Sequence, residues 1–249
     1  SMNRPLYLAA LAAGLAAVAW MAIGYAGHNP LALVMTLLIA AFYAMGALEL
    51  HRYQQATQGL HQALAAPPAV VDRPDDADPG ADADADAQAH AAAPAALHTW
   101  LDTVPEPLRN AVRLRLAGER VALPAPALTP YLAGLLVLLG MLGTFLGMVV
   151  TLQGTVMALE NTSDLQAIRA SLAAPVKGLG LAFGTSVAGV AASAMLGLMA
   201  ALCRRARLQA GQQLDSLLAG PLRPFTPAHQ QARQQARQQQ ALADQARLL

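Results

Sequence analysis

Charge is scarce in this 249-residue chain: Lys, Arg, Asp and Glu make up 12% of it, against about 25% in an ordinary soluble domain. Aromatic residues make up only 4%, so a large globular core would lack its usual bulky side chains. The formal net charge of +1 excludes a strongly basic surface, and we therefore expect no nucleic-acid partner. Apolar residues, by contrast, make up 55% of the chain.

Residues for disulfide and metal chemistry are also few. The chain has one cysteine, Cys203, which excludes a disulfide framework and a cysteine-based metal site. The histidines are far apart and none has a partner at ligand spacing. The sequence contains no Ser/His/Asp, Cys/His or phosphate-loop pattern. We therefore expect neither enzymatic activity nor a bound cofactor.

Long apolar runs are what the chain has in abundance. A helix that crosses a bilayer needs about 20 mostly apolar residues. Four segments meet this length: Leu6–Tyr25, Leu31–Leu48, Tyr131–Ala158 and Val176–Leu202. The sequence therefore predicts an all-α, polytopic membrane protein with four transmembrane helices.

Positive charges lie on one side of these spans. The connection 26–30 has no Lys or Arg, and the connection 160–175 has only Arg169. Arginines are frequent between the second and third spans and directly after the fourth: Arg52, Arg73, Arg109, Arg113, Arg115, Arg120, Arg204, Arg205 and Arg207. Because Lys and Arg are enriched on the cytoplasmic side of membrane proteins, we expect both termini and the middle region to be cytoplasmic.

The sequence divides into five parts. Residues 1–50 form the first transmembrane hairpin, and residues 129–203 hold the third and fourth helices. Between them, residues 51–97 form an Ala/Pro/Asp-rich linker, predicted to be disordered because it cannot bury a core. Residues 98–128 hold a cytoplasmic amphipathic helix. Residues 204–249 form a Gln/Arg-rich helical tail, either a solvated helix or the start of a stalk, and its pattern is consistent with a tail that continues beyond Leu249.

The amphipathic helix has a regular apolar face, at Leu101, Val104, Leu108 and Val112. Pro105 and Pro107 suit the first turn of a helix that runs through Arg115. Two placements fit this pattern: against the cytoplasmic ends of the transmembrane bundle, or on the membrane surface.

Small residues recur at close spacing in the third and fourth helices. In lipid, small residues let helix backbones approach each other closely. We expect six of them to pack these helices together: Gly143, Gly147, Gly180, Gly184, Gly189 and Ser193.

Threonines interrupt the same two apolar helices. At about 100° per residue, Thr144, Thr151 and Thr155 fall within about 20° of one line on the third helix. Thr185 lies among small residues on the fourth. One interpretation is that each hydroxyl only bonds the carbonyl four residues before it. The aligned stripe favours the other interpretation, a polar pathway for ions.

Carboxylates are absent from the four apolar runs of the sequence. An ion pathway needs an ionisable or coordinating group at membrane depth, so a partner must supply it if this chain conducts. Glu160 and Lys177 are candidates for the mouth of the pathway; alternatively they pair or extend to the membrane interface. Glu49 stands three residues before Arg52, which predicts an ion pair at the end of the second helix.

Two stretches resemble motifs of the MotA/TolQ/ExbB proton-channel family. GMLGTFLGM (140–148) is close to that family's GLLGTVxGI pattern, and LAFGTSVAGVAASA (181–194) is close to its ALxxTAxGLxAAxPA pattern. The resemblance covers Thr129 to Leu202. Four spans are more similar to the MotA branch, or to ZorA-type defence subunits, than to the three-span TolQ/ExbB branch. The Glu that this last branch has before the fourth-helix threonine is here Gly180.

The resemblance implies a stator-type motor subunit in the inner (cytoplasmic) membrane of a bacterium. Thr144 and Thr185 match the family's pore-facing threonines. It also implies a homopentamer around two copies of a MotB/ExbD/TolR-like single-span partner, whose transmembrane Asp handles the transported H⁺ or Na⁺. The alternative is a non-conducting membrane scaffold that anchors a cytoplasmic helical stalk.

Overall fold

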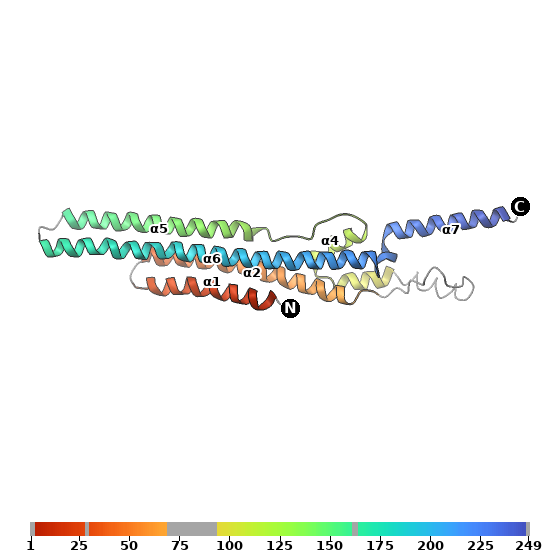
Figure 1. The fold of residues 1–249 in the computed structure, drawn as a ribbon, viewed down its shortest axis with the longest axis horizontal. Coiled ribbons are helices and arrows are strands. Elements are labelled where there is room, and N and C mark those ends of the chain that lie inside the picture. The colour runs from red at the N-terminus through yellow and green to blue at the C-terminus, as the bar shows by residue number, and fades with distance from the viewer. Residues whose placement is uncertain (1–2, 28–29, 69–93, 161–163, 248–249) are drawn as a thin grey trace. The chain divides into compact units, whose positions relative to one another are not determined.

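A computed structural model of the chain describes residues 3–27, 30–68, 94–160 and 164–247. The side chains of ten residues in helices are outside this description: Asn3, Ala158, Ser171, Ala174, Lys177, Leu181, Arg233, Arg237, Asp244 and Arg247. Throughout the described ranges the regular elements are helices and there is no strand (Figure 1). The elements are α1 (Asn3–Tyr25), α2 (Pro30–Ala65), α4 (Glu106–Leu116), α5 (Leu128–Glu160), α6 (Leu165–Ala219), η1 (Arg223–Phe225) and α7 (Pro227–Arg247), with a further helical segment over residues 94–103. The prediction of an all-α protein is confirmed.

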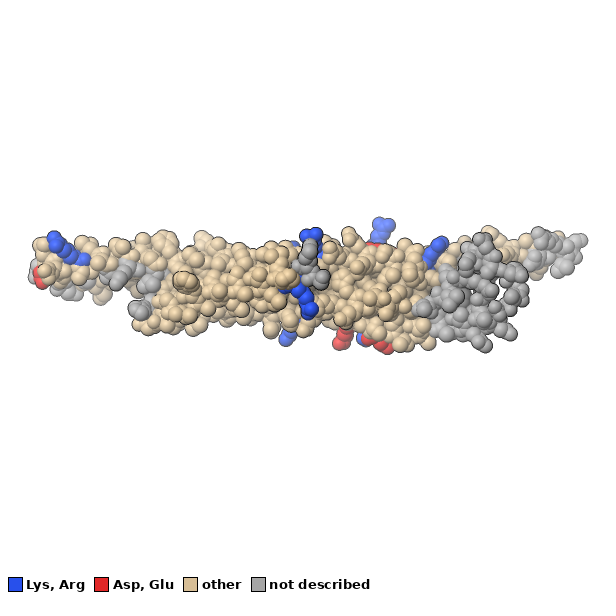
Figure 2. All heavy atoms as spheres, turned by 60° about the horizontal axis from the view of Figure 1, so that its bottom comes forward, with Lys and Arg blue, Asp and Glu red and all other residues tan. Residues whose placement is uncertain are grey.

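Four helices are long and apolar enough to cross a membrane, namely α1, α2, α5 and α6. They contain the four predicted spans. Within their apolar windows, between 22% and 39% of the residues are buried inside the chain. Figure 2 shows a broad stretch of this surface without Lys, Arg, Asp or Glu. Most of the apolar side chains of these helices are therefore left for lipid or for other chains to cover.

The chain forms two compact units. Unit 1 comprises residues 1–53 and 126–204, and unit 2 comprises residues 54–125 and 205–249. Unit 1 thus holds α1, α5, most of α2 and the larger part of α6. Its core is made by large apolar residues of α2, α5 and α6 facing alanines, including Ile39, Tyr43, Leu50, Leu132, Leu136, Ala188, Ala192, Leu196 and Met199.

Helix α1 presents small residues to α2, and this allows a tyrosine to fit between the helices. A Cβ at Gly14 would collide with the ring and hydroxyl of Tyr43. The Tyr43 hydroxyl lies 3.4 Å from the carbonyl oxygen of Ala10 and 3.3 Å from that of Leu11, so it can donate to either. A buried tyrosine needs such a partner for its hydroxyl, and the Ala/Gly composition of α1 makes these carbonyls accessible.

Unit 2 has its own apolar core around the predicted amphipathic helix. Leu108 and Val112 of α4 are almost fully buried, together with Leu60 of α2 and Leu214 of α6. Trp100 closes this core, and its indole N–H donates to the carbonyl oxygen of Ala63 at 2.8 Å. The apolar face of α4 therefore packs on the last turns of α2 and α6, and this excludes the alternative in which that face lies on the membrane.

The structure changes the predicted limits of two parts. Residues 51–65, expected in the disordered linker, continue α2, because Leu60 and Leu64 are buried in the core of unit 2. Residues 69–93 of that linker lie outside the described residues. Helix α6 likewise continues past the predicted end of the fourth span to Ala219 for the same reason, since Leu214 is fully buried.

Prolines and glycines set the ends of the helices of unit 2. Pro105 is the N-cap of α4 and Pro107 lies in its first turn, as the sequence predicted. The break after α6 falls at Gly220–Pro221 and is followed by η1. Beyond it, the described side chains of α7 after His229 are all exposed, which fits both the solvated helix and the start of a stalk.

Candidate functional site

The candidate site lies where α5 and α6 cross with no side chain between their backbones. A Cβ at Gly189 would lie 2.6 Å from the carbonyl oxygen of Leu136 and 2.8 Å from the Cα of Gly140. A Cβ at Gly140 would in turn lie 3.2 Å from the Cα of Gly189. Glycine at both positions therefore permits the contact, as expected for helices that pack in lipid.

The next turns of α5 continue this close packing. A Cβ at Gly143 would lie 2.8 Å from Thr185 Oγ1, and a Cβ at Gly147 would lie 2.9 Å from the Cβ of Ala182. Both glycines of the predicted GxxxG pair on α5 therefore face α6. Ser193 stabilises the other end of the same interface, near the start of α5, by donating to the carbonyl oxygen of Ala133 at 2.7 Å.

The two glycines of the predicted pair on α6 face different surroundings. Gly184 faces α1, because a Cβ there would collide with the hydroxyl of Tyr25. Gly180 has nothing within 4 Å of the position where its Cβ would be. Gly180 therefore does not pack a helix within this chain, contrary to the expectation from its GxxxG spacing.

Three hydroxyl groups meet at the crossing, from Thr144, Thr185 and Ser186, which we call the hydroxyl cluster. Thr144 Oγ1 lies 2.9 Å from Ser186 Oγ and 3.5 Å from Thr185 Oγ1. The cluster also has two backbone acceptors: the carbonyl oxygen of Ala182 is 3.0 Å from Thr144 Oγ1 and 2.9 Å from Thr185 Oγ1, and that of Gly140 is 3.1 Å from Thr144 Oγ1. The structure thus brings together the two threonines that match the family motifs.

The chemistry available to the hydroxyl cluster follows from its groups. Thr185 is only 1% exposed, while Thr144 and Ser186 are half-buried. Each hydroxyl has one proton to donate and two lone pairs to accept with, so the three can exchange hydrogen bonds with one another. The cluster has no charge of its own, and a carboxylate would have to come from another chain.

Thr151 and Thr155 continue the stripe along α5 but stand apart from the cluster. Thr151 donates to the carbonyl oxygen of Gly147 at 2.7 Å, and Thr155 donates to that of Thr151 at 2.9 Å. Thr151 also faces α6, since a Cβ at Gly178 would lie 2.7 Å from its Oγ1. These two hydroxyls follow the simpler interpretation, in which each bonds the carbonyl four residues before it.

The two candidates for the mouth of the pathway lie far from the cluster. Glu160 is the last residue of α5 and is exposed. Lys177 belongs to α6, and its side chain is outside the described part of the chain. A role for either in admitting ions stays a prediction.

The carboxylate of Glu49 in α2 accepts hydrogen bonds from the start of α5. The sequence had predicted an ion pair with Arg52 for it instead. Glu49 Oε1 accepts from the backbone N–H groups of Ala127 and Leu128, both at 3.1 Å. Glu49 Oε2 accepts from the hydroxyl of Thr129, a residue with no exposed surface. A negative charge at a helix N-terminus is favourable because the free N–H groups and the helix dipole point toward it.

Sequence reasoning missed two members of the α5–α6 crossing, Gly140 and Ser186. Each had a signal: Gly140 stands one turn before Thr144, and Ser186 directly follows Thr185. The contact of Glu49 with the start of α5 had no such signal, because nothing in the sequence pairs a residue near the second span with the start of the third.

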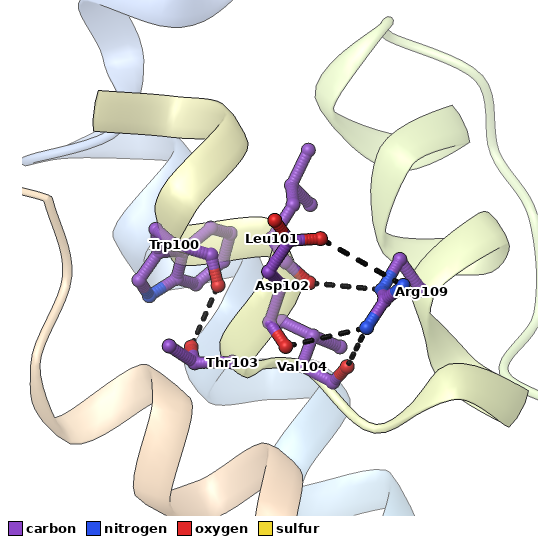
Figure 3. A network of polar contacts seen from close by, with 6 residues as sticks. All are labelled: Trp100, Leu101, Asp102, Thr103, Val104 and Arg109. Atoms are coloured by element: carbon purple, nitrogen blue, oxygen red, sulfur yellow. Dashed lines mark hydrogen bonds and ion pairs between the residues drawn. The ribbon is translucent and has the colours of Figure 1, made fainter. Parts of the chain in front are cut away.

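Unit 2 has a second polar cluster, at the corner between the 94–103 segment and α4 (Figure 3). Arg109 donates to the carbonyl oxygens of Leu101, Asp102 and Val104 at 3.1, 3.2 and 3.4 Å, and it lies 3.7 Å from the Asp102 carboxylate. A cavity of about 360 Å³ beside it is lined by His98, Leu101, Asp102, Glu106, Arg109, Asn110 and Arg113. Because its guanidinium is occupied by the last carbonyls of a helix, Arg109 stabilises the corner.

The described residues contain no group of three His, Cys, Asp or Glu side chains that could hold a metal ion. The strongest site of the described chain is therefore the hydroxyl cluster. No family model, curated protein or solved structure matches the chain in the comparisons made.

Proposed function

We propose that this chain is an ion-conducting, stator-type motor subunit of a bacterial inner membrane. Five copies form a ring around two copies of a single-span partner that carries a transmembrane Asp. The flow of H⁺ or Na⁺ past that Asp turns the ring relative to the partner, so that ion-motive force does mechanical work.

The observation that carries the proposal is the meeting of Thr144 with Thr185 and Ser186 between two membrane-length helices. These residues lie within the two stretches that resemble the MotA/TolQ/ExbB motifs. Hydroxyls at membrane depth can donate to an ionised carboxylate and accept from a protonated one. The cluster is thus suited to act beside a carboxylate that changes its protonation or binds a cation.

The distribution of charge within the chain agrees with a partner that brings the carboxylate. Neither the apolar stretch 129–157 of α5 nor the stretch 178–203 of α6 contains an Asp or Glu. Glu49 directly follows the predicted second span, 31–48, and is bound to the start of α5. The stoichiometry of five to two comes from the family resemblance.

The test is ion flux through purified complexes of the chain with its partner in proteoliposomes. Thr144→Val and Thr185→Val keep the size of the side chain but remove the hydroxyl, and we expect each to lower flux about tenfold, the value of one hydrogen bond of ~1.4 kcal/mol. Thr36→Val is the matched control, because Thr36 is also buried in a span and donates only to Ala32 of its own helix, at 2.8 Å.

Mass photometry of each complex must accompany the flux measurement. A pentamer that conducts normally with either valine would contradict the role of the hydroxyl cluster. A monomer, a dimer or an open array of the unaltered chain would contradict the stator proposal as a whole.

The second candidate is a non-conducting scaffold that anchors a cytoplasmic stalk. One observation favours it: Thr144 and Thr185 each have a carbonyl acceptor within the chain, so both hydroxyls are satisfied without an ion. A scaffold would show no flux with any partner, and would tolerate both valine substitutions with little loss of stability.

A further inference from the structure

At the level of the hydroxyl cluster, α6 is held between two helices of the same chain. Gly189 and Thr185 face α5, where the backbones touch and the hydroxyls meet. Gly184 faces α1, because a Cβ there would collide with the hydroxyl of Tyr25. At about 100° per residue, Gly184 lies about 140° around α6 from Gly189. The contacts with α1 and α5 are therefore on nearly opposite sides of α6.

The contact with α1 is made by its last turn. Tyr25 is the final residue of α1 and is only 2% exposed. Its hydroxyl touches α6 at Gly184 and is in polar contact with the backbone of Thr185. Met21 lies one turn earlier on the same face, and its sulfur would be 3.0 Å from a Cβ at Gly184. The end of α1 thus packs on the backbone of the residue that precedes Thr185.

Tyr25 occupies the side toward which this turn of α6 could move. Closer approach to α5 is blocked, because Gly189 and Gly140 already touch through their backbones. A shift away from α5 would take the turn toward α1, where the ring and hydroxyl of Tyr25 fill the space. Protein interiors are close-packed, and neighbouring groups relax in part toward a gap that opens among them. Tyr25 therefore keeps α6 against α5.

The hydroxyl cluster is sensitive to the position of this turn. Thr185 Oγ1 lies 3.5 Å from Thr144 Oγ1 and 3.5 Å from the carbonyl oxygen of Gly140. Ser186 Oγ lies 3.4 Å from the same carbonyl oxygen. Because O–H···O hydrogen bonds are usually about 2.5–3.0 Å long, these contacts are at the upper limit, and a further separation of about 0.5 Å would end them. The contact of Thr185 with α5 thus depends on where α6 is held.

We propose that Tyr25 is a positioning residue for the hydroxyl cluster: it sets the distance between Thr185 and Thr144 by filling the space between α1 and the backbone of α6 at Gly184. This inference rests on the proposed ion-conducting function and deepens it, because it gives the first helix a part in the pathway. Tyr25 does not contact the ion. It acts through Thr185, whose hydroxyl it keeps within reach of α5.

A second tyrosine–glycine pair of the same kind provides a matched control. A Cβ at Gly14 of α1 would collide with the hydroxyl of Tyr43, which has no exposed surface. That hydroxyl lies 3.3 and 3.4 Å from two backbone carbonyl oxygens of α1. The pair joins α1 to α2, and neither helix carries a member of the hydroxyl cluster. Loss of either tyrosine hydroxyl should lower stability, but only the loss at Tyr25 should lower ion flow.

The test measures ion flux per ring in proteoliposomes, with rings counted by mass photometry and stability followed by thermal unfolding. We expect Tyr25→Phe to lower flux about threefold, less than the loss of about tenfold expected when the Thr185 hydroxyl is removed, because the hydrogen bond is weakened rather than abolished. Gly184→Ala alone should also lower flux, since its methyl group displaces Tyr25. Together, Tyr25→Phe and Gly184→Ala should restore most of the flux, because the methyl group takes the space of the missing hydroxyl.

Combination with Thr185→Val distinguishes a positioning role from a merely structural one. If Tyr25 acts through Thr185, then Tyr25→Phe should cause no further loss of flux in a Thr185→Val background, so the two effects are not additive. Tyr43→Phe should lower the melting temperature but leave the flux per ring unchanged in both backgrounds.

Several results would overturn the role of Tyr25 and leave the proposed function standing. These are additive losses of flux, an equal loss with Tyr43→Phe, a Tyr25→Phe ring that conducts like the unaltered one, and a Tyr25→Phe/Gly184→Ala ring that conducts no better than Tyr25→Phe. An unaltered chain that forms rings with its partner but conducts no ions would instead refute the proposed function together with this role.

Discussion

Two glycines of α6 show how differently one residue type acts along a single helix. Gly189 touches the backbone of α5, whereas Gly180 faces open space. Both belong to a small-xxx-small pattern, so the sequence could not separate them. The difference arises from the side of α6 that faces α5, which depends on the packing of the whole helix pair.

Substitution by alanine should separate the two glycines. Gly189→Ala places a methyl group against backbone atoms that cannot move aside, and we expect a loss of about 1–3 kcal/mol of stability. Gly180→Ala should be neutral or should stabilise the helix by about 0.5–1 kcal/mol, because alanine is the better helix former. Thermal unfolding of the detergent-purified protein, followed by size-exclusion chromatography, measures both; equal melting temperatures would contradict the close contact.

The residues of the hydroxyl cluster were only partly predictable. Thr144 and Thr185 stood out because they match the family motifs, and the structure places their Oγ1 atoms 3.5 Å apart. The stripe of three threonines on α5 was real as a line on the helix, yet only Thr144 lies at the crossing. Which hydroxyl residues join the cluster depends on where the two helices are closest. The pattern of a single helix does not contain that information.

Among the helices, α5 depends on another helix for its first turn. Glu49→Ala removes the acceptor for two backbone N–H groups and the Thr129 hydroxyl, and we expect it to cost about 1–2 kcal/mol. Hydrogen exchange of residues 126–132 should become faster, because the start of α5 loses its cap. Glu160→Ala is the control at the other end of α5, where an exposed carboxylate lies against the negative end of the helix dipole and its loss costs nothing.

At the corner between the 94–103 segment and α4, two substitutions can distinguish the stability contributed by hydrogen bonds from that contributed by the ion pair. Arg109→Ala removes the donor to three carbonyls and should cost about 1 kcal/mol. Asp102→Asn removes only the partner of a loose ion pair whose side chains are 41% and 77% exposed, and should cost less than about 0.5 kcal/mol. Hydrogen exchange over residues 94–116 reports both, and a larger effect of Asp102→Asn would show that the ion pair stabilises the corner.

The four apolar helices were predictable because bilayer thickness imposes their length on the sequence. The continuation of α2 to Ala65 was not predictable, because these turns are polar on one side and apolar on the other. The region after the fourth span was expected to be helical, and α6 continues through it to Ala219. The apolar residues of these continuations, such as Leu60 and Leu214, look isolated until the 97–116 region is placed beside them. Long-range packing, which local patterns do not encode, decided these helix ends.

For the molecule as a whole, the distribution of arginines predicts the orientation in the membrane. Alkaline phosphatase fused within residues 161–163 should be active, because that connection is expected outside the cytoplasm. Fluorescent protein fused after Leu249 should fold and fluoresce, because the C-terminus is expected inside. The opposite pattern would invert the topology and place unit 2 on the far side of the membrane.

The composition of the core of unit 2 has a consequence for biosynthesis. Its members come from residues 60–64, 97–116 and 210–225, so the last contributors leave the ribosome long after the first. At about 5–20 residues per second, the apolar face of α4 waits roughly 5–20 s for its partners on α6. During that interval α5 and the membrane-spanning part of α6 must be inserted. Completion of the core of unit 2 thus marks, in each newly made chain, that all four apolar helices have been synthesised. A chain arrested before Phe225 should be held by chaperones or degraded.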